Sequence, residues 1–404
     1  MIINEQSDYK YHIKKTLNKM QNVSKWQYNF LLEVFGLYLS IKGRINFLQF
    51  ARFGCRTEQS YRNQFEQKFD FLEFNKQLVL EEGSGHYTIA FDPSYISKSG
   101  KSTYGVGYYW SGLASSTKWG LEIGGIGAID IDNHTAFHLE AVQTPNDLKP
   151  KTLLDFYSQS IIERKQSLQE ISTYVVADAY FSKEPFTSAL TANGFELVSR
   201  LRNDAFLRYK FIGQQKDGRG RPKQYDGKVD FNNLDLNHFI EIENNNLCKI
   251  YNAKVHAKAL KRFVNLVIIY TKKKEKWSHK LYFSTDLNLE TNLLLEYYQT
   301  RFQIEFIYRD AKQFTGLHNF QGRSQEKLYF HFNTSLTSIN LAKVTHWISI
   351  PKENRKAFSM SSIKTMYHNQ LLLNRFINVF GIMPNRMKNN KKIRELVKWG
   401  VIAA

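Results

Sequence analysis

The chain has 404 residues, of which 42% are hydrophobic and 23% are charged, so it can form two or three domains with a sizeable core. Its 56 Lys and Arg residues against 37 Asp and Glu residues give a formal charge of +19, which favours a polyanionic partner such as DNA or RNA. A basic protein of unrelated function has the same composition, so charge alone does not decide. Two cysteines exclude a disulfide framework.

The N-terminal sequence has no apolar core of signal-peptide type, and no apolar stretch is long enough to span a bilayer. A reducing cytosol, without a membrane association, is therefore the expected location.

Residues 1–80 are predicted to be helical and basic. The apolar stretch 26–41 has helical length, 44–53 is a second candidate, and a third helix should begin after Thr57, a suitable N-cap residue. Three short helices with several arginines fit a DNA-reading helix-turn-helix, and they fit equally well a plain helical subdomain with solvated arginines.

The region 81–202 has a different pattern, in which strands come first and then alternate with helices. The expected elements, in chain order, are strands at 86–92, 104–110 and 121–139, a helix at 153–168, a strand at 173–177, a helix at 182–192 and a strand at 195–200. This order predicts an α/β fold with a mixed sheet flanked by helices.

The alternation is interrupted at residues 203–279, which are predicted to form a mainly β insertion. The second part of the core is expected at 280–350, with one long helix at 289–314, and a basic helical region at 351–404. The chain is thus predicted to consist of five regions, 1–80, 81–202, 203–279, 280–350 and 351–404.

Three acidic residues are candidate metal ligands. Asp92 and Asp178 each end a predicted buried strand, and ligands of open α/β sheets bind just beyond such strand ends. If the two strands are neighbours, their carboxylates converge, and Glu305 on the later helix can add a third oxygen ligand for a cation such as Mg²⁺. Taken singly, a strand-ending Asp is more often a turn residue, and a mid-helix Glu is more often solvated.

Four further polar residues surround Glu305 on the predicted helix 289–314. Tyr298, Arg301, Glu305 and Lys312 fall within an arc of about 60° on one face, along about 20 Å of helix, and Arg309 joins them. An acid between these cations suits a metal ion beside a phosphate backbone, although the same stripe would also suit a solvated face.

Two histidines, His134 and His138, lie four residues apart in a predicted strand region, where they do not share a helical face. A structural role is therefore expected for them in preference to a zinc site. No GxxxxGK[ST] phosphate loop and no GxSxG elbow occurs.

The pattern Tyr298-x2-Arg301-x3-Glu305-x6-Lys312 resembles the Tyr-Arg-Glu-Lys signature of bacterial insertion-sequence transposases. These enzymes have a ribonuclease-H-like core with an Asp, Asp, Glu (DDE) triad. The segments FDPSYISKSGK, VVADAYFSKEPF with LVSRLRND, and LYFSTDLNLETNLLLEYYQTRFQIE are similar to the family's three motif regions. The resemblance covers about 80–350 and leaves both ends of the chain without a quotable motif.

The resemblance implies that Asp92, Asp178 and Glu305 bind two Mg²⁺ ions, for which Mn²⁺ can substitute. It implies that Tyr298, Arg301 and Lys312, with Arg309 beside them, contact double-stranded DNA at the element end. The family also has a β insertion between the second Asp and the Glu, in which a tryptophan can hold a flipped base. Trp277 is the candidate here, with a merely buried or exposed tryptophan as the alternative.

The expected function is therefore a Mg²⁺-dependent DNA transposase that cleaves element ends and joins the 3′-OH to target DNA. It should act as a homodimer that bridges two ends, with the C-terminal helices as the candidate contact. The alternatives are a ribonuclease-H-like nuclease without strand transfer and a catalytically inactive DNA-binding regulator.

Overall fold

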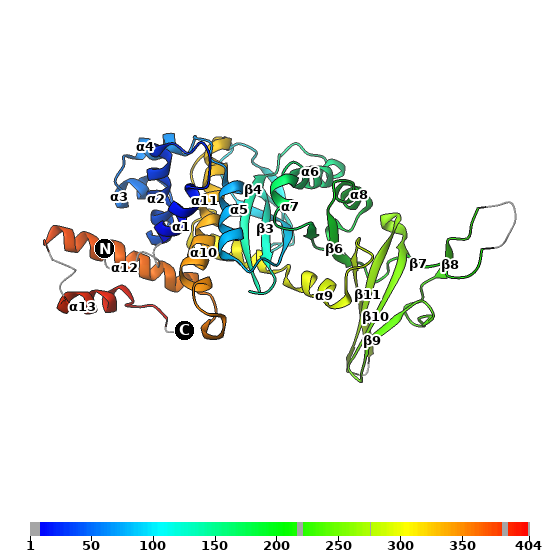
Figure 1. Cartoon of the computed structure of the whole chain (residues 1–404). Coiled ribbons are helices and arrows are strands. Elements are labelled where there is room, and N and C mark those ends of the chain that lie inside the picture. The colour runs from blue at the N-terminus through cyan, green and yellow to red at the C-terminus, as the bar shows by residue number, and fades with distance from the viewer. Residues whose placement is uncertain (1–8, 216–220, 275, 382–386, 403–404) are drawn as a thin grey trace. The chain divides into compact units, whose positions relative to one another are not determined.

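The structure is a computed structural model that describes residues 9–215, 221–274, 276–381 and 387–402. The chain divides into two compact units. Figure 1 colours the chain from blue at the N-terminus to red at the C-terminus. Unit 1 comprises Met1–His86, Pro93–Asp147 and Gln303–Ala404, and unit 2 comprises Tyr87–Asp92 and Leu148–Phe302.

Unit 1 combines helices from both ends of the chain with a small antiparallel set of strands. Its helices are α1 (Tyr9–Leu17), α2 (Lys25–Ser40), α3 (Phe47–Phe53), α4 (Glu58–Gln64), α5 (Phe71–Glu82), α10 (Gln303–Phe314), α11 (Gln325–Lys343), α12 (Met360–Val379) and α13 (Met387–Val397). Its strands are β2 (Gly107–Ser111), β3 (Ser116–Asp130) and β4 (Thr135–Gln143), in which β3 pairs with both others, together with the 93–97 part of β1 (Tyr87–Ser97).

Helix α11 packs along the edge of β4 that does not pair with β3. Asn340 accepts a hydrogen bond from the backbone N–H of His138 and donates one to its carbonyl, and Asn333 does the same for Ala141. The two buried amides thus satisfy strand groups that would otherwise need another strand. His138 is enclosed in this contact with Nε2 3.0 Å from Asn333 Oδ1, and burial lowers its pKa to about 3. His138 is therefore a structural residue, as expected.

Aromatic packing joins the N-terminal helices to α11. Phe65 lies 5.1 Å from Phe47 and 4.6 Å from Phe330 between ring centroids, and all three rings are buried. The predicted helical N-terminal and C-terminal regions are confirmed, and Thr57 caps α4 by accepting a hydrogen bond from Ser60 N. None of the described helices is long and apolar enough to cross a membrane.

Unit 2 is built on a mixed sheet. Its elements are the 87–92 part of β1 (Tyr87–Ser97), α6 (Pro150–Ile162), α7 (Lys165–Gln169), β5 (Tyr174–Val176), η2 (Ala179–Phe181), α8 (Glu184–Ala192), β6 (Glu196–Leu201), β7 (Leu207–Lys210), β8 (Tyr225–Lys228), β9 (Ile240–Asn244), β10 (Cys248–Ala257), η3 (Lys258–Leu260), β11 (Arg262–Lys273), β12 (Lys276–Ser284) and α9 (Thr291–Thr300). Strands β1, β5 and β6 are parallel. The strands then continue antiparallel in the order β6, β12, β11, β10, β7, β8, with β9 on β10.

The predicted α/β class with a mixed sheet is confirmed, and the arrangement is consistent with a ribonuclease-H-like fold. The long hairpin of β10 and β11 stands out in green in Figure 1. Residues 203–279 contain strands and the short helix η3, and the division of the chain into five regions remains a prediction.

Four element boundaries differ from the sequence prediction. Strand β1 continues through Pro93 to Ser97, because a proline lacks only the N–H and not the extended backbone that a strand needs. The stretch 121–139 is two strands, β3 and β4. The helix predicted at 153–168 is the pair α6 and α7, and the one at 289–314 is the pair α9 and α10.

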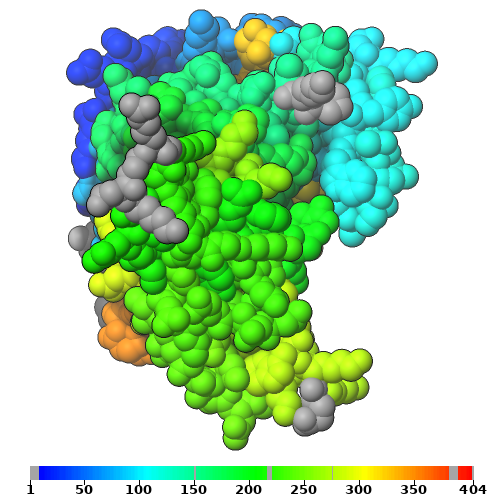
Figure 2. Space-filling view, turned by 90° about the vertical axis from the view of Figure 1, so that its right-hand side faces the viewer, coloured from blue at the N-terminus to red at the C-terminus, as the bar shows by residue number. Residues whose placement is uncertain are grey.

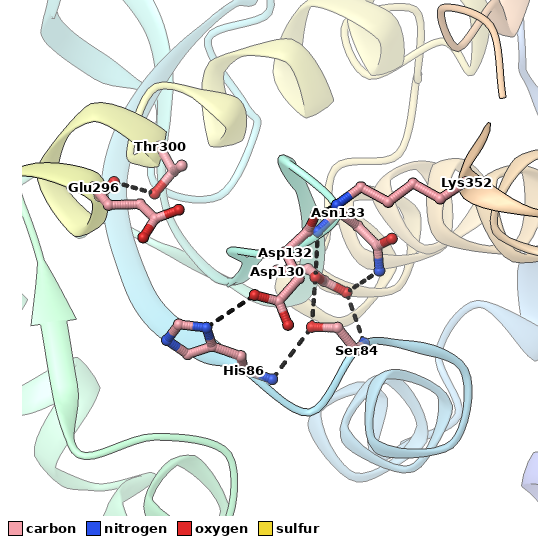
Figure 3. A network of polar contacts seen from close by, with 8 residues as sticks. All are labelled: Ser84, His86, Asp130, Asp132, Asn133, Glu296, Thr300 and Lys352. Carbon is pink, nitrogen blue, oxygen red and sulfur yellow. Dashed lines mark hydrogen bonds and ion pairs between the residues drawn. The ribbon is translucent and has the colours of Figure 1, made fainter. Parts of the chain in front are cut away.

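The turn between β3 and β4 is held by one buried carboxylate, that of Asp130, shown in Figure 3. Its two oxygens accept hydrogen bonds from Ser84 N and Oγ, at 2.9 and 2.7 Å, and from Asn133 N and Nδ2, at 3.0 and 2.9 Å. This anchor lets His134 adopt a positive φ of 47° without a glycine, so the sequence carries no glycine signal for the turn.

Replacing Asp130 with alanine should lower the free energy of unfolding by about 3 kcal/mol, because four donors at the turn lose a carboxylate acceptor that is itself fully buried. The matched control is His86→Ala in the same network. His86 pairs with Asp132 at the surface, where such a pair contributes about 1 kcal/mol or less. Urea denaturation followed by circular dichroism measures both, and equal losses would contradict this account.

Candidate active site

The parallel pairing of β1 with β5 brings Asp92 and Asp178 level with each other in unit 2. Ile89 pairs with Val175 and Ala90 with Val176. Asp92 and Asp178 each lie two residues after the last pair, so the two backbone segments are in register at the aspartates. Neighbouring strands of a sheet lie about 4.8 Å apart. Asp92 does not end its strand, but the expected neighbourhood of the two strands is confirmed.

Asp178 is fixed by its own turn. Its Oδ1 accepts a hydrogen bond from Tyr180 N at 2.8 Å at the start of η2, and its carbonyl accepts one from Ser199 Oγ at 3.0 Å. Ser199 is fully buried and also lies 2.9 Å from Ser182 Oγ. The hydroxyls of β6 and of the turn therefore hold the backbone that presents the Asp178 carboxylate.

Two residues at the end of α9 lie beside these aspartates. Arg301 Nη1 is 3.9 Å from Asp92 Oδ1, and both side chains are mostly buried. The ring of Tyr298 packs 5.0 Å from that of Tyr282. Burial raises the pKa of Tyr298, Arg301 and Arg200 lower it, and the Asp178 carboxylate raises it further.

Arg200 on β6 is a site residue that sequence reasoning missed. Its Nε is buried and has no hydrogen-bond partner among the described residues. It opposes Tyr282 across the β6–β12 pair and acts electrostatically on Tyr298. The segment LVSRLRND carried the signal, but only the fold shows that Arg200, and not Arg202, belongs to this cluster.

Glu305, Arg309 and Lys312 lie on α10, whereas Tyr298 and Arg301 lie at the end of α9, so the prediction of one uninterrupted helix over 289–314 is wrong. That these side chains share one site stays a prediction. The helix is interrupted at Arg301 and Phe302, between α9 and α10. Glu305 is exposed in the first turn of α10, and Lys312 Nζ donates a hydrogen bond to Ser94 Oγ at 2.9 Å. Arg309 pairs with Asp310 at 2.8 Å.

Trp277 lies on β12, away from the end of that strand where Tyr282 meets Tyr298. It is 42% exposed and lines a pocket of about 360 Å³ with Tyr251, Tyr270 and other residues of the β region. Lys249 Nζ lies 5.1 Å from its ring. The atoms of this region face the viewer in green to yellow-green in Figure 2.

The donor set suits a hard cation only in part. Carboxylate oxygens are the preferred ligands of Mg²⁺, and unit 2 supplies two carboxylates, one on β1 and one just after β5. Among the described residues no group of three His, Cys, Asp or Glu side chains is close enough to hold a metal ion. The third predicted ligand, Glu305, belongs to unit 1.

Asp92 on β1 and Asp178 just beyond β5, with arginines nearby, are a candidate site for phosphodiester chemistry on nucleic acid. Residues 158–341 match the family model of the transposase DDE domain. The match supports a DDE transposase, an enzyme that acts on DNA. It contains Asp178 and Glu305 and begins after Asp92. A search of curated proteins found no match to the chain.

Replacing Arg200 with methionine should leave the free energy of unfolding unchanged or raise it by up to about 1 kcal/mol, because a buried unpaired N–H is removed. The matched control is Arg262→Met. Arg262 donates to Thr191 Oγ1 at 2.7 Å and to Ser188 Oγ at 2.8 Å, so its loss should cost about 2 kcal/mol. Chemical denaturation tests both. A loss of 2 kcal/mol for Arg200→Met would show that Arg200 is structural.

Proposed function

We propose that the protein binds the ends of a bacterial insertion sequence, cleaves them by metal-dependent hydrolysis and joins the 3′-OH to target DNA. The observation that carries this proposal is the parallel register of β1 with β5, which places Asp92 on β1 level with Asp178, two residues beyond β5. The transposase match, which includes Asp178 and Glu305, supports it. As a DNA enzyme it would work in the cytoplasm, at the nucleoid.

Asp92, Asp178 and Glu305 would hold the metal, as two Mg²⁺ ions for which Mn²⁺ can substitute. When bound, such ions activate the attacking oxygen and stabilise the leaving oxygen of a phosphodiester. The protein would supply the three carboxylates, and it would hold Asp178 in place through Ser199 and the Tyr180 N–H.

The cationic residues would bind the DNA backbone next to those carboxylates. Arg301 has a planar fork of N–H donors that matches phosphate oxygens, and the buried Arg200 Nε is a donor that such a phosphate would satisfy. Lys312 and Arg309 would bind phosphates from α10. These proposed contacts give Arg301 and Lys312 of the Tyr-Arg-Glu-Lys signature a common role in DNA binding, although the two residues lie on different helices.

Tyr298 would act as a hydrogen-bond donor and not as a base. Its pKa is raised, mainly by burial, above the usual value of about 10, so the hydroxyl keeps its proton at neutral pH. A protonated phenol can donate to a phosphate oxygen, and Tyr298 lies beside Arg301 and Arg200, which favour the same anion.

The remaining expectations concern Trp277 and assembly. The exposed ring of Trp277, with Tyr251 and Tyr270 in the same pocket, gives an aromatic surface on which an unpaired base could stack. A homodimer bridging two element ends is proposed, with the helices of residues 351–404 as the contact. Exposed Phe376 and Phe380 near the end of α12 suit such a contact.

The variant Asp178→Asn should keep its affinity for end DNA within about twofold and lose Mg²⁺-dependent cleavage by at least about a thousandfold, since one metal ligand is lost. The substrate is a labelled duplex of the inverted repeats that flank the reading frame. Asp155→Asn, an exposed position on α6, is the control and should cleave normally. Normal cleavage by Asp178→Asn would refute the site. If the unaltered protein cleaves the DNA without strand transfer, the protein is a nuclease and the proposed transposition is refuted.

A further inference from the structure

A second basic feature lies entirely in unit 1, apart from the residues assigned above. It is a groove of about 1290 Å³, and three stretches of chain line it. They are the helical region with Arg44 and Arg62, the segment 97–103 together with Trp119, and the segment 318–324 together with Lys327. Pockets for small ligands measure about 300–1,000 Å³, so this groove is large enough for a polymer.

The charged residues that line the groove are all positively charged. Arg44, Arg62, Lys98, Arg323 and Lys327 line it, and none of its lining residues is an Asp or a Glu. Arg62 pairs with Glu58 and Lys327 with Glu66, both outside the lining.

Arg44 and Arg323 are both exposed, and within the described part of the chain no carboxylate lies within ion-pair distance of either. Together with Lys98, they leave three positive charges in the groove without a compensating acid.

Lys98 connects two walls of the groove and contributes a positive charge to its lining. Its Nζ donates to the carbonyls of Phe320, at 2.5 Å, and Gly322, at 3.4 Å, so it ties two walls together. Burial lowers the pKa of Lys98, and Arg323 lowers it further. The cations therefore repel one another, and a bound polyanion would relieve that repulsion.

An exposed aromatic surface continues from the groove wall. Tyr108, Trp110 and Trp119 lie on one face of the β2–β3 hairpin, because Tyr108 pairs with Trp119 and Trp110 follows two residues later. Their exposed fractions are 73%, 60% and 37%, and the rings of Tyr108 and Trp119 lie 5.2 Å apart. Large aromatic side chains exposed together mark an interaction surface.

We propose that this groove binds the phosphate backbone of double-stranded DNA and that the aromatic face of the β2–β3 hairpin packs against the sugars and bases beside it. The proposal rests on the proposed function, because it assigns a further part of the same DNA to unit 1. Phosphate contacts of this kind position a protein on a duplex without reading its sequence.

The chain connects the groove to Lys312. Strand β1 carries Ser94, which accepts the Lys312 hydrogen bond, and four residues later it leads to Lys98. Helix α10 leads from Lys312 to the opposite wall at His318. A duplex phosphate near Lys312 and one in the groove would therefore contact neighbouring parts of the same two segments.

The first test removes two charges from the groove. The double variant R44Q/R323Q should bind a 30-base-pair duplex at least about tenfold more weakly and should lower the slope of log K against log salt by about 2, since two phosphate contacts are lost. The matched control K14Q/R52Q removes two exposed cations of unit 1 outside the groove. Fluorescence anisotropy of the full chain with EDTA measures binding without cleavage.

The second test separates the aromatic contact from charge. Trp119→Ala should weaken binding about threefold or more and leave the salt slope unchanged, because no counterion is released by an apolar contact. Trp26→Ala is the control, since Trp26 is 70% exposed and belongs to unit 1 outside the groove. Thermal melting of each variant checks that it is folded.

The outcomes distinguish the groove from the proposed function. If R44Q/R323Q and K14Q/R52Q weaken binding equally, the effect is general charge and the groove proposal is overturned. The proposed function then stands if Asp178→Asn still abolishes cleavage. If the unaltered protein binds no duplex at all, both proposals fail. If Trp119→Ala binds DNA with unchanged affinity, the proposed contact between the aromatic face and DNA is refuted.

Discussion

The parallel pairing of β1 with β5 is the constraint on which the proposed site depends. Backbone hydrogen bonding sets the register at Ile89 with Val175 and Ala90 with Val176, and this register makes Asp92 and Asp178 neighbours. Two carboxylates so placed repel each other unless cations lie near them. Arg301 beside Asp92, and Arg200 close by, supply that positive charge, so the acids and the basic residues form one electrostatic arrangement.

The remaining residues of the proposed site lie on α10. Glu305, Arg309 and Lys312 occupy a helix whose buried face, with Ile304, Ile307 and Ala311, belongs to the core of unit 1. The break between α9 and α10 separates these residues from Tyr298 and Arg301 in structural terms, although they are close in sequence. The signature residues therefore belong to two helices, and a common site for them stays a proposal.

Much of this could be predicted from the sequence, because hydrophobic runs and caps are local signals. The strand before Asp178 and the Thr57 cap were of this kind. The turn at Asp130 was missed because its anchor, Ser84, is distant in sequence and no glycine marks the bend. The break at Arg301 was missed because no glycine or proline marks it in the sequence. Arg200 and the groove depend on tertiary neighbours, which periodicity does not encode.

The central claim is that Asp92, Asp178 and Glu305 bind the same metal ions although they come from two units. Electron paramagnetic resonance of Mn²⁺, titrated into the full chain with uncleavable end DNA, tests it directly. The account predicts that Asp92→Asn and Glu305→Gln each weaken Mn²⁺ binding by at least about tenfold, whereas Glu296→Gln on α9 binds as the unaltered protein does. Unchanged Mn²⁺ binding by Glu305→Gln would contradict the claim.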